Sequence, residues 1–316
     1  MKVLDGEILF LYDAKMANPN GDPDEENKPR MDYATSRALV SDVRLKRYLR
    51  DYWLSRGADV WVRTLDSGTV TADQRLKALA EDYKAATGQE VDVKKTVPDE
   101  FIDWLLGRLI DVRLFGATMP IKGDSAGQGG GLTFTGPVQF AWGYTLHPAE
   151  IVESATISST FSGRDNQFGT FGKDWRLHYG LIAFMGRVSA ARAGATGLKP
   201  DDLDALEDAL LRAIPAEATT RSKFGQTPRL YLHVRYKEER YPFPPVGDFR
   251  DLVEFQPNEG LPPRKVRSVE DYTLGLAPLT EALSSRSESI EEIRLWIHPD
   301  LRTAGWEGLP NVHRVG

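Results

Sequence analysis

The chain has 316 residues, of which 41% are hydrophobic, 27% are charged and none is cysteine, and its formal net charge is −6. This composition allows one large folded domain or two smaller ones, and it excludes disulfides, thiolate metal sites and a cysteine nucleophile. An acidic chain has no general attraction for nucleic acid, so any nucleic-acid site must be a local cluster of cations.

The N-terminal segment predicts a strand followed by a long loop. Its apolar stretch contains acids and is followed by no small-residue cleavage site, which excludes a signal peptide. Because no apolar run approaches the roughly 20 residues of a membrane span, we expect a cytoplasmic protein. Residues Glu7 to Met16 form the expected strand, and the turn-rich loop NPNGDPDEENKPRMD, from Asn18 to Asp32, leads away from it.

The acids of this loop raise the question of a calcium site. Asp22, Asp24 and Glu26 alternate, as calcium ligands often do. An EF-hand loop counted from Asp22 needs glycine at its sixth position and glutamate at its twelfth, but these positions hold Asn27 and Tyr33. We therefore expect a structural loop and no metal.

Residues Ser41 to Leu54 predict a helix with two unlike faces. Its apolar arc on a helical wheel consists of Leu45, Tyr48, Leu49, Tyr52 and Trp53. Its four cations are assigned to the opposite arc, and they are Arg44, Lys46, Arg47 and Arg50. Two interpretations of the cationic face stay open. It is either a solvated surface whose cations pair with Asp42 and Asp51, or a surface whose excess positive charge binds a phosphate backbone.

The stretch from Gly57 to Ile110 is polar and mostly helical, and it predicts an inserted subdomain. A glycine-rich loop follows, in which GDSAG, from Gly123 to Gly127, matches the G-x-S-x-G pattern of a nucleophile elbow. No helix is predicted after it, so Ser125 is not expected to be catalytic, and the loop amides can instead approach a phosphate. None of the five histidines pairs with another at metal-ligand spacing.

The second half of the chain alternates strands and helices. Strands are expected at Pro137 to Leu146, Leu177 to Val188, Leu230 to Lys237 and Glu291 to Asp300, a hairpin at Thr156 to Trp175, and a helix at Pro200 to Ile214. With the insertions set aside, the element order is β-α-β-β-α-β. This order predicts an α+β fold of the ferredoxin-like or RNA-recognition-motif type.

The hairpin interleaves cations with aromatic residues, which suits stacking on unpaired bases. Its residues of this kind are Phe161, Arg164, Phe168, Phe171, Lys173, Trp175 and Arg176. The alternative is an ordinary hairpin whose aromatic side chains dock on the protein itself. Arg221, Lys223 and Arg229 add three cations just before the strand that begins at Leu230.

Six segments together resemble one known family. They are NPNGDPD, KPRMD, VSDVRLKRYLRD, DVRLFGA, TGPVQFAWGYTLHP and TTRSKFGQTPRLYLHVRY. They resemble the backbone subunit of type I CRISPR Cascade complexes, closest to the subtype I-B form, within the RAMP superfamily. The resemblance runs from Lys2 to about Lys237, and it is weaker in residues 64–97 and in the last sixty or so residues.

The resemblance implies a single RAMP-type domain shaped like a hand. The expected palm comprises residues 1–56, 111–155 and 176–316, the helical fingers about 57–110, and the thumb hairpin about 156–175. The implied function is non-catalytic: copies of the subunit polymerise in a helical filament along the guide RNA, beside other Cascade subunits, and support pairing of the guide with target DNA. No cofactor and no membrane contact are implied.

The resemblance also carries over the residues expected to contact RNA, with Lys46 and Arg50 as the first candidates for phosphate contacts. The full set is Asn20, Lys28, Arg30, Arg44, Lys46, Arg47, Arg50, Gln139, Arg164, Phe168, Lys173, Arg176, Arg221 and Lys223. The alternative function is a RAMP-type endoribonuclease, for which Asp22, Asp24 or His178 would be the residues to test.

Overall fold

The computed structural model describes residues 2–63, 71–93, 97–120, 131–153, 155–159, 170–238, 241–242 and 244–316. The chain divides into two compact units. The helical unit comprises Met1–Asp5, Leu49–Gln139 and Arg187–Ala209, and the sheet unit comprises Gly6–Tyr48, Phe140–Gly186 and Leu210–Gly316. Each unit is described by itself.

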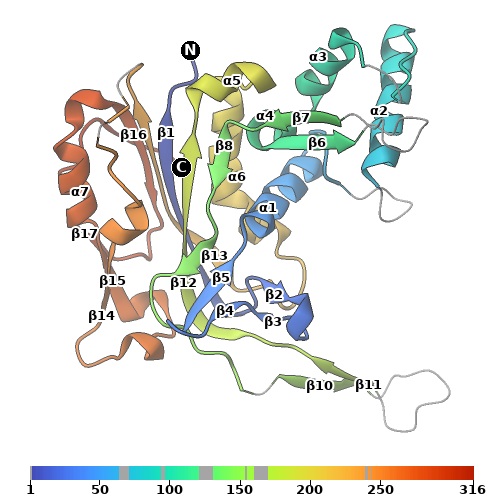
Figure 1. The fold of residues 1–316 in the computed structure, drawn as a ribbon. Coiled ribbons are helices and arrows are strands. Elements are labelled where there is room, and N and C mark those ends of the chain that lie inside the picture. Colours follow the sequence, from blue (N-terminus) through green and yellow to red (C-terminus); the bar gives the residue numbers. More distant parts are fainter. Residues whose placement is uncertain are drawn as a thin grey trace. The chain divides into compact units, whose positions relative to one another are not determined.

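The sheet unit is built on one large sheet (Figure 1). Its strands follow the order β18-β16-β13-β1-β12-β9-β5-β4. Their bounds are β1 Gly6–Ala17, β4 Met31–Asp32, β5 Arg37–Val40, β9 Gly143–Thr145, β12 Leu177–Val188, β13 Gln226–Tyr236, β16 Ile290–Ile297 and β18 Val312–Arg314. β1, β12 and β13 lie side by side at its centre, and this confirms the three expected strands that they contain.

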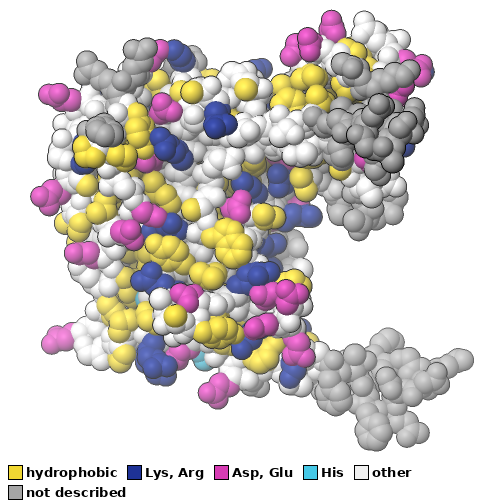
Figure 2. Space-filling view, in the orientation of Figure 1, with side chains coloured by type: hydrophobic (Ala, Val, Ile, Leu, Met, Phe, Trp, Pro, Cys, Tyr) yellow, Lys and Arg dark blue, Asp and Glu magenta, His cyan; other side chains and the backbone are white. Residues whose placement is uncertain are grey.

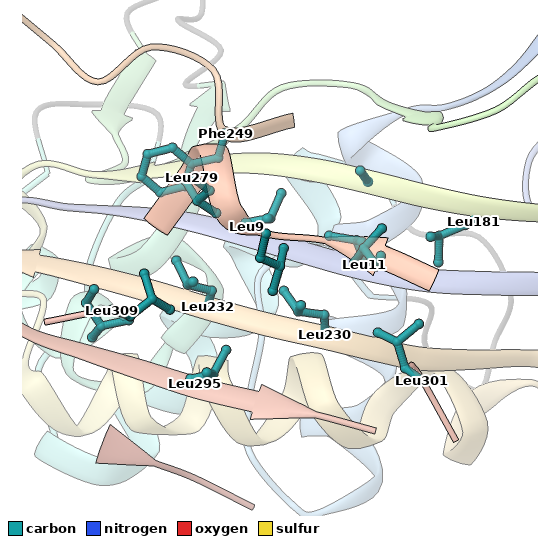
Figure 3. Packing of buried hydrophobic residues seen from close by; sticks show 14 of the residues in the cluster. Leu9, Leu11, Leu181, Leu230, Leu232, Phe249, Leu279, Leu295, Leu301 and Leu309 are labelled. Atoms are coloured by element: carbon teal, nitrogen blue, oxygen red, sulfur yellow. The ribbon is translucent and has the colours of Figure 1, made fainter. Parts of the chain in front are cut away.

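The three strands β1, β13 and β16 carry the main apolar core. β1 pairs antiparallel with β13, placing Leu9 opposite Leu232, and β13 pairs antiparallel with β16, placing Leu232 opposite Leu295. These leucines point to one face of the sheet, where Leu279 and Phe249 of the C-terminal segment pack against them (Figure 3). The opposite face is also covered, since Tyr12 and Phe184 are buried and their rings stack 6.2 Å apart.

Smaller elements complete the sheet unit. The C-terminal segment that covers the leucine face contains α7 Ala277–Ser284, β14 Glu254–Pro257, β15 Tyr272–Gly275 and β17 Thr303–Ala304, with short 3-10 turns at Phe249–Leu252, Pro263–Lys265, Val269–Asp271 and Ser287–Ser289. The loop after β1 forms a hairpin of β2 Gly21–Asp22 and β3 Lys28–Pro29 around the 3-10 turn Pro23–Glu25. β10 Thr156–Ser159 pairs with β11 Thr170–Lys173, so the stem of the predicted hairpin is confirmed, whereas residues 160–169 lie outside the described part.

The helical unit contains α2 Ala72–Thr87, α3 Asp99–Arg108, α4 Ile110–Phe115, α5 Ala190–Thr196 and the hairpin of β6 Gly116–Pro120 with β7 Gly131–Thr135. α2 begins at a capping box between Thr71 and Gln74, and it ends at Gly88, whose φ of 76° suits glycine. Its core includes Leu79, Phe101 and Leu105. The helices expected between residues 57 and 110 are thus confirmed.

Four elements cross the division between the units: α1 Asp42–Ser55, α6 Pro200–Glu217, β8 Val138–Phe140 and the end of β12. The helix expected to end at Ile214 continues to Glu217 with Pro215 inside its last turn. The single strand expected from Pro137 to Leu146 is instead two short strands, β8 and β9, separated at Ala141 and Trp142.

The mixed α+β class predicted from the sequence is confirmed. Ser125 lies outside the described residues, and the described chain resumes at the strand β7. No helix in the described part of the chain is long and apolar enough to cross a membrane.

The core assignment makes a direct prediction about stability. Leu232 is fully buried between Leu9 and Leu295, so Leu232→Ala removes apolar contacts and leaves a cavity. We expect the free energy of unfolding to fall by about 3 kcal/mol, measured by denaturant titration. The control Val43→Ala, at a position that is 64% exposed, should change it by less than about 0.5 kcal/mol. Equal effects of the two substitutions would contradict the assignment.

Candidate nucleic-acid interface

The loop after β1 is fastened to the first turn of α1. The Asn20 side-chain oxygen accepts hydrogen bonds from the Ser41 amide at 2.8 Å and from the Ser41 hydroxyl at 3.0 Å. The Ser41 hydroxyl in turn accepts from the amide of Arg44 at 3.3 Å, which caps the helix. Asn20, predicted to contact RNA, therefore also holds the loop against the helix.

The acids of this loop serve its own geometry. One Asp22 oxygen pairs with Arg30 at 2.9 Å, and the other accepts from the amide of Asp24 at 3.2 Å. Glu26 and Asn27 adopt positive φ values of 52° and 62°, which form the tight turn. Within the described residues, no group of three or more His, Cys, Asp or Glu side chains could hold a metal ion.

A cavity of 340 Å³ lies beside this loop in the sheet unit. Three segments line it: the loop after β1 at Asn18, the end of β11 from Lys173 to Trp175, and the turn from Thr220 to Lys223. The segments are far apart in the sequence but adjacent in the fold because β1 pairs with β13, and Ala14 lies opposite Gln226 at the end of that pairing. The structure therefore brings Lys173, Arg221 and Lys223 of the predicted RNA-binding set around one concave surface.

Aromatic rings accompany these cations. The ammonium groups of Lys28 and Lys173 lie 5.6 Å and 5.8 Å from the ring centre of Trp175, and Lys28 also lies 5.5 Å from that of Tyr33. The guanidinium of Arg44 stacks on Tyr48 at 3.8 Å. Such contacts hold cationic side chains in place while leaving their charge available to an anion.

Few carboxylates of the described residues pair with the cations around the cavity. Asp174 pairs with Arg176 at 2.7 Å and with Arg221 at 3.3 Å, and the Arg221 side chain is 64% exposed. Arg176 also donates to the backbone oxygen of Met16 at 3.0 Å. Two guanidinium groups thus depend on one carboxylate, which leaves an excess of positive charge beside the cavity.

Lys223 is the most perturbed of these cations. Its ammonium donates to the backbone oxygens of Asn18 at 2.6 Å and Pro19 at 3.5 Å, and it contacts no carboxylate of the described residues. Burial, with a further contribution from the nearby charge of Arg44, lowers the pKa of Lys223 to about 7. A buried ammonium without a counter-ion is the situation that a bound phosphate would relieve.

The faces of α1 differ from those predicted. The apolar arc is buried as expected, but Lys46 and Arg50 are only 8% and 9% exposed. Lys46 pairs with Asp42 at 2.9 Å, and Arg50 pairs with Asp111 at 2.7 Å. The predicted outer face of four cations is therefore not formed, because positions 46 and 50 border the apolar arc on the helical wheel and are covered with it.

The Arg50 pair lies within the core of the helical unit. Asp111 is 1% exposed, and its carboxylate also accepts from the backbone amide of Trp61 at 2.7 Å. This geometry gives Arg50 a structural role in holding α1 to the segment after it.

Three other predicted residues lie elsewhere. Gln139 belongs to the helical unit, where its side chain is exposed and its amide nitrogen donates to the backbone oxygen of Gly136 at 3.0 Å. Arg164 and Phe168 lie outside the described residues. Asn18 was interpreted only as a turn former, and its place in the cavity wall depends on strand pairing that no local pattern reveals.

Among the described residues, His298 lies near a carboxylate: its Nδ1 is 3.6 Å from an Asp300 oxygen and accepts from the Asp300 amide at 3.1 Å. His147 and His233 are buried, and burial lowers their pKa values to about 4 and about 3, so both stay neutral near pH 7. The side chain of His178 makes no hydrogen bond to another described residue, while its backbone amide donates to the backbone oxygen of Glu150 at 2.9 Å. Nothing in this geometry supports the ribonuclease alternative.

Lys and Arg side chains gather on the face shown in Figure 2, over the position of α1 and the β2–β3 hairpin. Acidic side chains lie among them near the hairpin. The chain's negative net charge is thus compatible with a local cationic surface.

Comparison with known proteins gives consistent similarities. The family model described as CRISPR-associated protein Cas7 matches residues 5–277. A CRISPR-associated protein Cas7 of Haloferax volcanii is 32% identical over 302 residues, which cover 92% of this chain and 85% of that protein.

Chains of two solved structures align with this chain over nearly its whole length. A chain of a CRISPR RNA-guided surveillance complex aligns with a TM-score of 0.51 and 14% identity, covering 98% of this chain and 94% of that one. A chain of a pre-nicking CRISPR RNA-guided surveillance complex aligns with a TM-score of 0.48 and 16% identity, covering 99% and 96%.

The buried ion pair of α1 can be tested by its effect on stability. Arg50→Met leaves the Asp111 carboxylate buried without its counter-ion, so we expect the free energy of unfolding to fall by about 3 kcal/mol. Lys77→Met, at an exposed position of α2 in the same unit, is the matched control and should have little effect. Chemical denaturation of both variants measures the difference, and an unchanged stability of Arg50→Met would contradict a structural role.

Proposed function

This chain belongs to the Cas7 family of CRISPR-associated proteins, and we propose that it acts as the backbone subunit of a type I surveillance complex. In this role it binds guide RNA through the phosphate backbone and supports pairing of the guide with a target DNA strand. The observation that carries the proposal is the cluster of Lys173, Arg221 and Lys223 around one cavity, with a single carboxylate, Asp174, to balance its cations.

Recognition of the backbone suits a guide of changing sequence. Contacts to phosphates fix the position of a strand without reading its bases, and base pairing then supplies the specificity. The cations of the cavity come from two separate segments, the end of β11 and the turn from Thr220 to Lys223. Backbone hydrogen bonds hold this turn in place, such as that from the Asn18 amide to the Ser222 oxygen at 2.7 Å. A preorganised cationic surface of this kind binds a strand at low entropic cost.

The same proposal assigns parts of the chain to a hand. The palm comprises residues 1–56, 111–155 and 176–316. It contains the adjacent strands β13, β1, β12 and β9 together with the helices α1 and α6. The fingers are the helices of residues 57–110, and the thumb is the hairpin of residues 156–175, whose stem is β10 and β11. Copies of the chain, placed side by side along the guide and beside other Cascade subunits, then form the backbone of the complex, which has no catalytic step of its own.

The RNA contacts can be tested by their salt dependence. Lys173→Ala combined with Arg221→Ala removes two candidate phosphate contacts, so the slope of log affinity against log salt should become shallower by about 1.4. Fluorescence anisotropy with a single-stranded RNA across a salt series measures the slope. Lys265→Ala, which removes a cation of the same unit at a different site, should leave it unchanged. An unaltered slope in the double variant would place the RNA elsewhere.

The depressed pKa of Lys223 predicts a pH dependence of binding. In the free protein Lys223 loses its proton as the pH rises through about 7, and a bound phosphate favours the charged form and raises that pKa. Binding above pH 7 therefore takes up a proton, and affinity should fall by up to about tenfold from pH 7 to pH 8.

Lys223→Arg provides the control, because a guanidinium keeps its charge throughout this range. Its affinity should vary much less between pH 6 and pH 8.5 than that of the parent protein. If the parent shows the same flat profile, Lys223 does not contact the phosphate.

A further inference from the structure

Phe224 stands out as an apolar side chain that the fold leaves uncovered. It is 77% exposed, at the end of the turn that precedes β13. Met16, at the end of β1, is 43% exposed and has a φ of 49°, which a non-glycine residue seldom adopts. Both residues line a second concavity of 580 Å³, which shares Thr220 and Arg221 with the cavity of Lys223.

The backbone beneath Phe224 is held firmly. The amide of Lys15 donates to the Gly225 oxygen at 2.8 Å, and the amides of Lys223 and Phe224 both donate to the Thr220 oxygen, at 2.9 and 3.1 Å. Gly225 has a φ of 95°, and a Cβ there would lie 2.4 Å from the Lys15 oxygen, so only glycine fits. Phe224 is therefore exposed on a backbone of fixed geometry.

The surroundings of this ring are cationic. Arg221 and Thr220 line both concavities, so the two share one wall. Lys15 and Arg176 also line the concavity of Phe224, and Arg176 is held there by its bond to the Met16 oxygen. An apolar protein partner would have to cover these charges, whereas a nucleotide presents a flat base beside an anionic phosphate.

We propose that Phe224, supported by Met16, stacks on an unpaired nucleobase of the guide strand whose backbone lies over Arg221 and Lys223. This inference rests on the proposed function, and it extends that function from phosphate contacts to a base-stacking site. Stacking on an aromatic side chain tolerates any base, since each base has a π face, so the site would not restrict the guide sequence.

The test compares the parent protein with Phe224→Ala and Phe224→Tyr. The probe is a single-stranded RNA that carries 2-aminopurine, whose fluorescence falls when it stacks. We expect the parent and Phe224→Tyr to quench the probe, and Phe224→Ala to quench it less and bind it roughly 5- to 100-fold more weakly. A matched RNA with abasic positions keeps the phosphates, so it should bind the parent and Phe224→Ala equally.

Each other outcome has a defined meaning. Equal affinity and quenching of the parent and Phe224→Ala, with weaker binding by the Lys173→Ala and Arg221→Ala double variant, overturns the stacking site and leaves the proposed function standing. A change in oligomeric state of Phe224→Ala without RNA, measured by light scattering, overturns it in favour of a contact between copies. If the parent binds no RNA at physiological salt, this result contradicts both the stacking site and the proposed RNA contacts.

Discussion

The antiparallel pairing of β1 with β13 is the constraint on which the rest of the sheet unit depends. It aligns Leu9 and Leu11 with Leu232 and Leu230 in the core, and it brings the end of β1 to the beginning of β13. The loop after β1 and the turn before β13 therefore meet at the same end of these two strands. They are neighbours in the fold although they are more than 200 residues apart in the sequence. Strand register thus determines both the packing of the leucines and the position of the cationic cavity.

This arrangement also explains how an acidic chain can present a cationic surface. The fold does not neutralise the cations of the cavity individually: Asp174 is shared by two guanidinium groups, and within the described residues the Lys223 ammonium donates only to the backbone oxygens of Asn18 and Pro19. Keeping an ammonium in this environment lowers its pKa and costs stability in the free protein. A ligand phosphate would offset that cost, so the energy that the fold gives up becomes part of the free energy of binding.

Local patterns predicted the elements well and the faces of α1 less well. Alternation and apolar periodicity are local properties, so β1, β12, β13 and the helices of residues 57–110 could be expected from them. The role of Arg50 could not, because its partner Asp111 is 61 residues away and becomes a neighbour only in the folded chain. The cavity was predictable only in part: Lys173, Arg221 and Lys223 were identified as cations, but their convergence follows from strand pairing rather than from spacing.

The turn before β13 carries the features on which the proposed binding of a nucleic-acid strand rests. Its backbone is hydrogen-bonded to Lys15 of β1 and to Asn18 just after that strand, so Arg221, Lys223 and Phe224 are carried by one short segment of fixed backbone. A nucleic acid offers phosphates and bases at a similarly short and regular separation. In the proposed function both contacts are independent of base identity, so the subunit would hold any guide and leave the target sequence to base pairing.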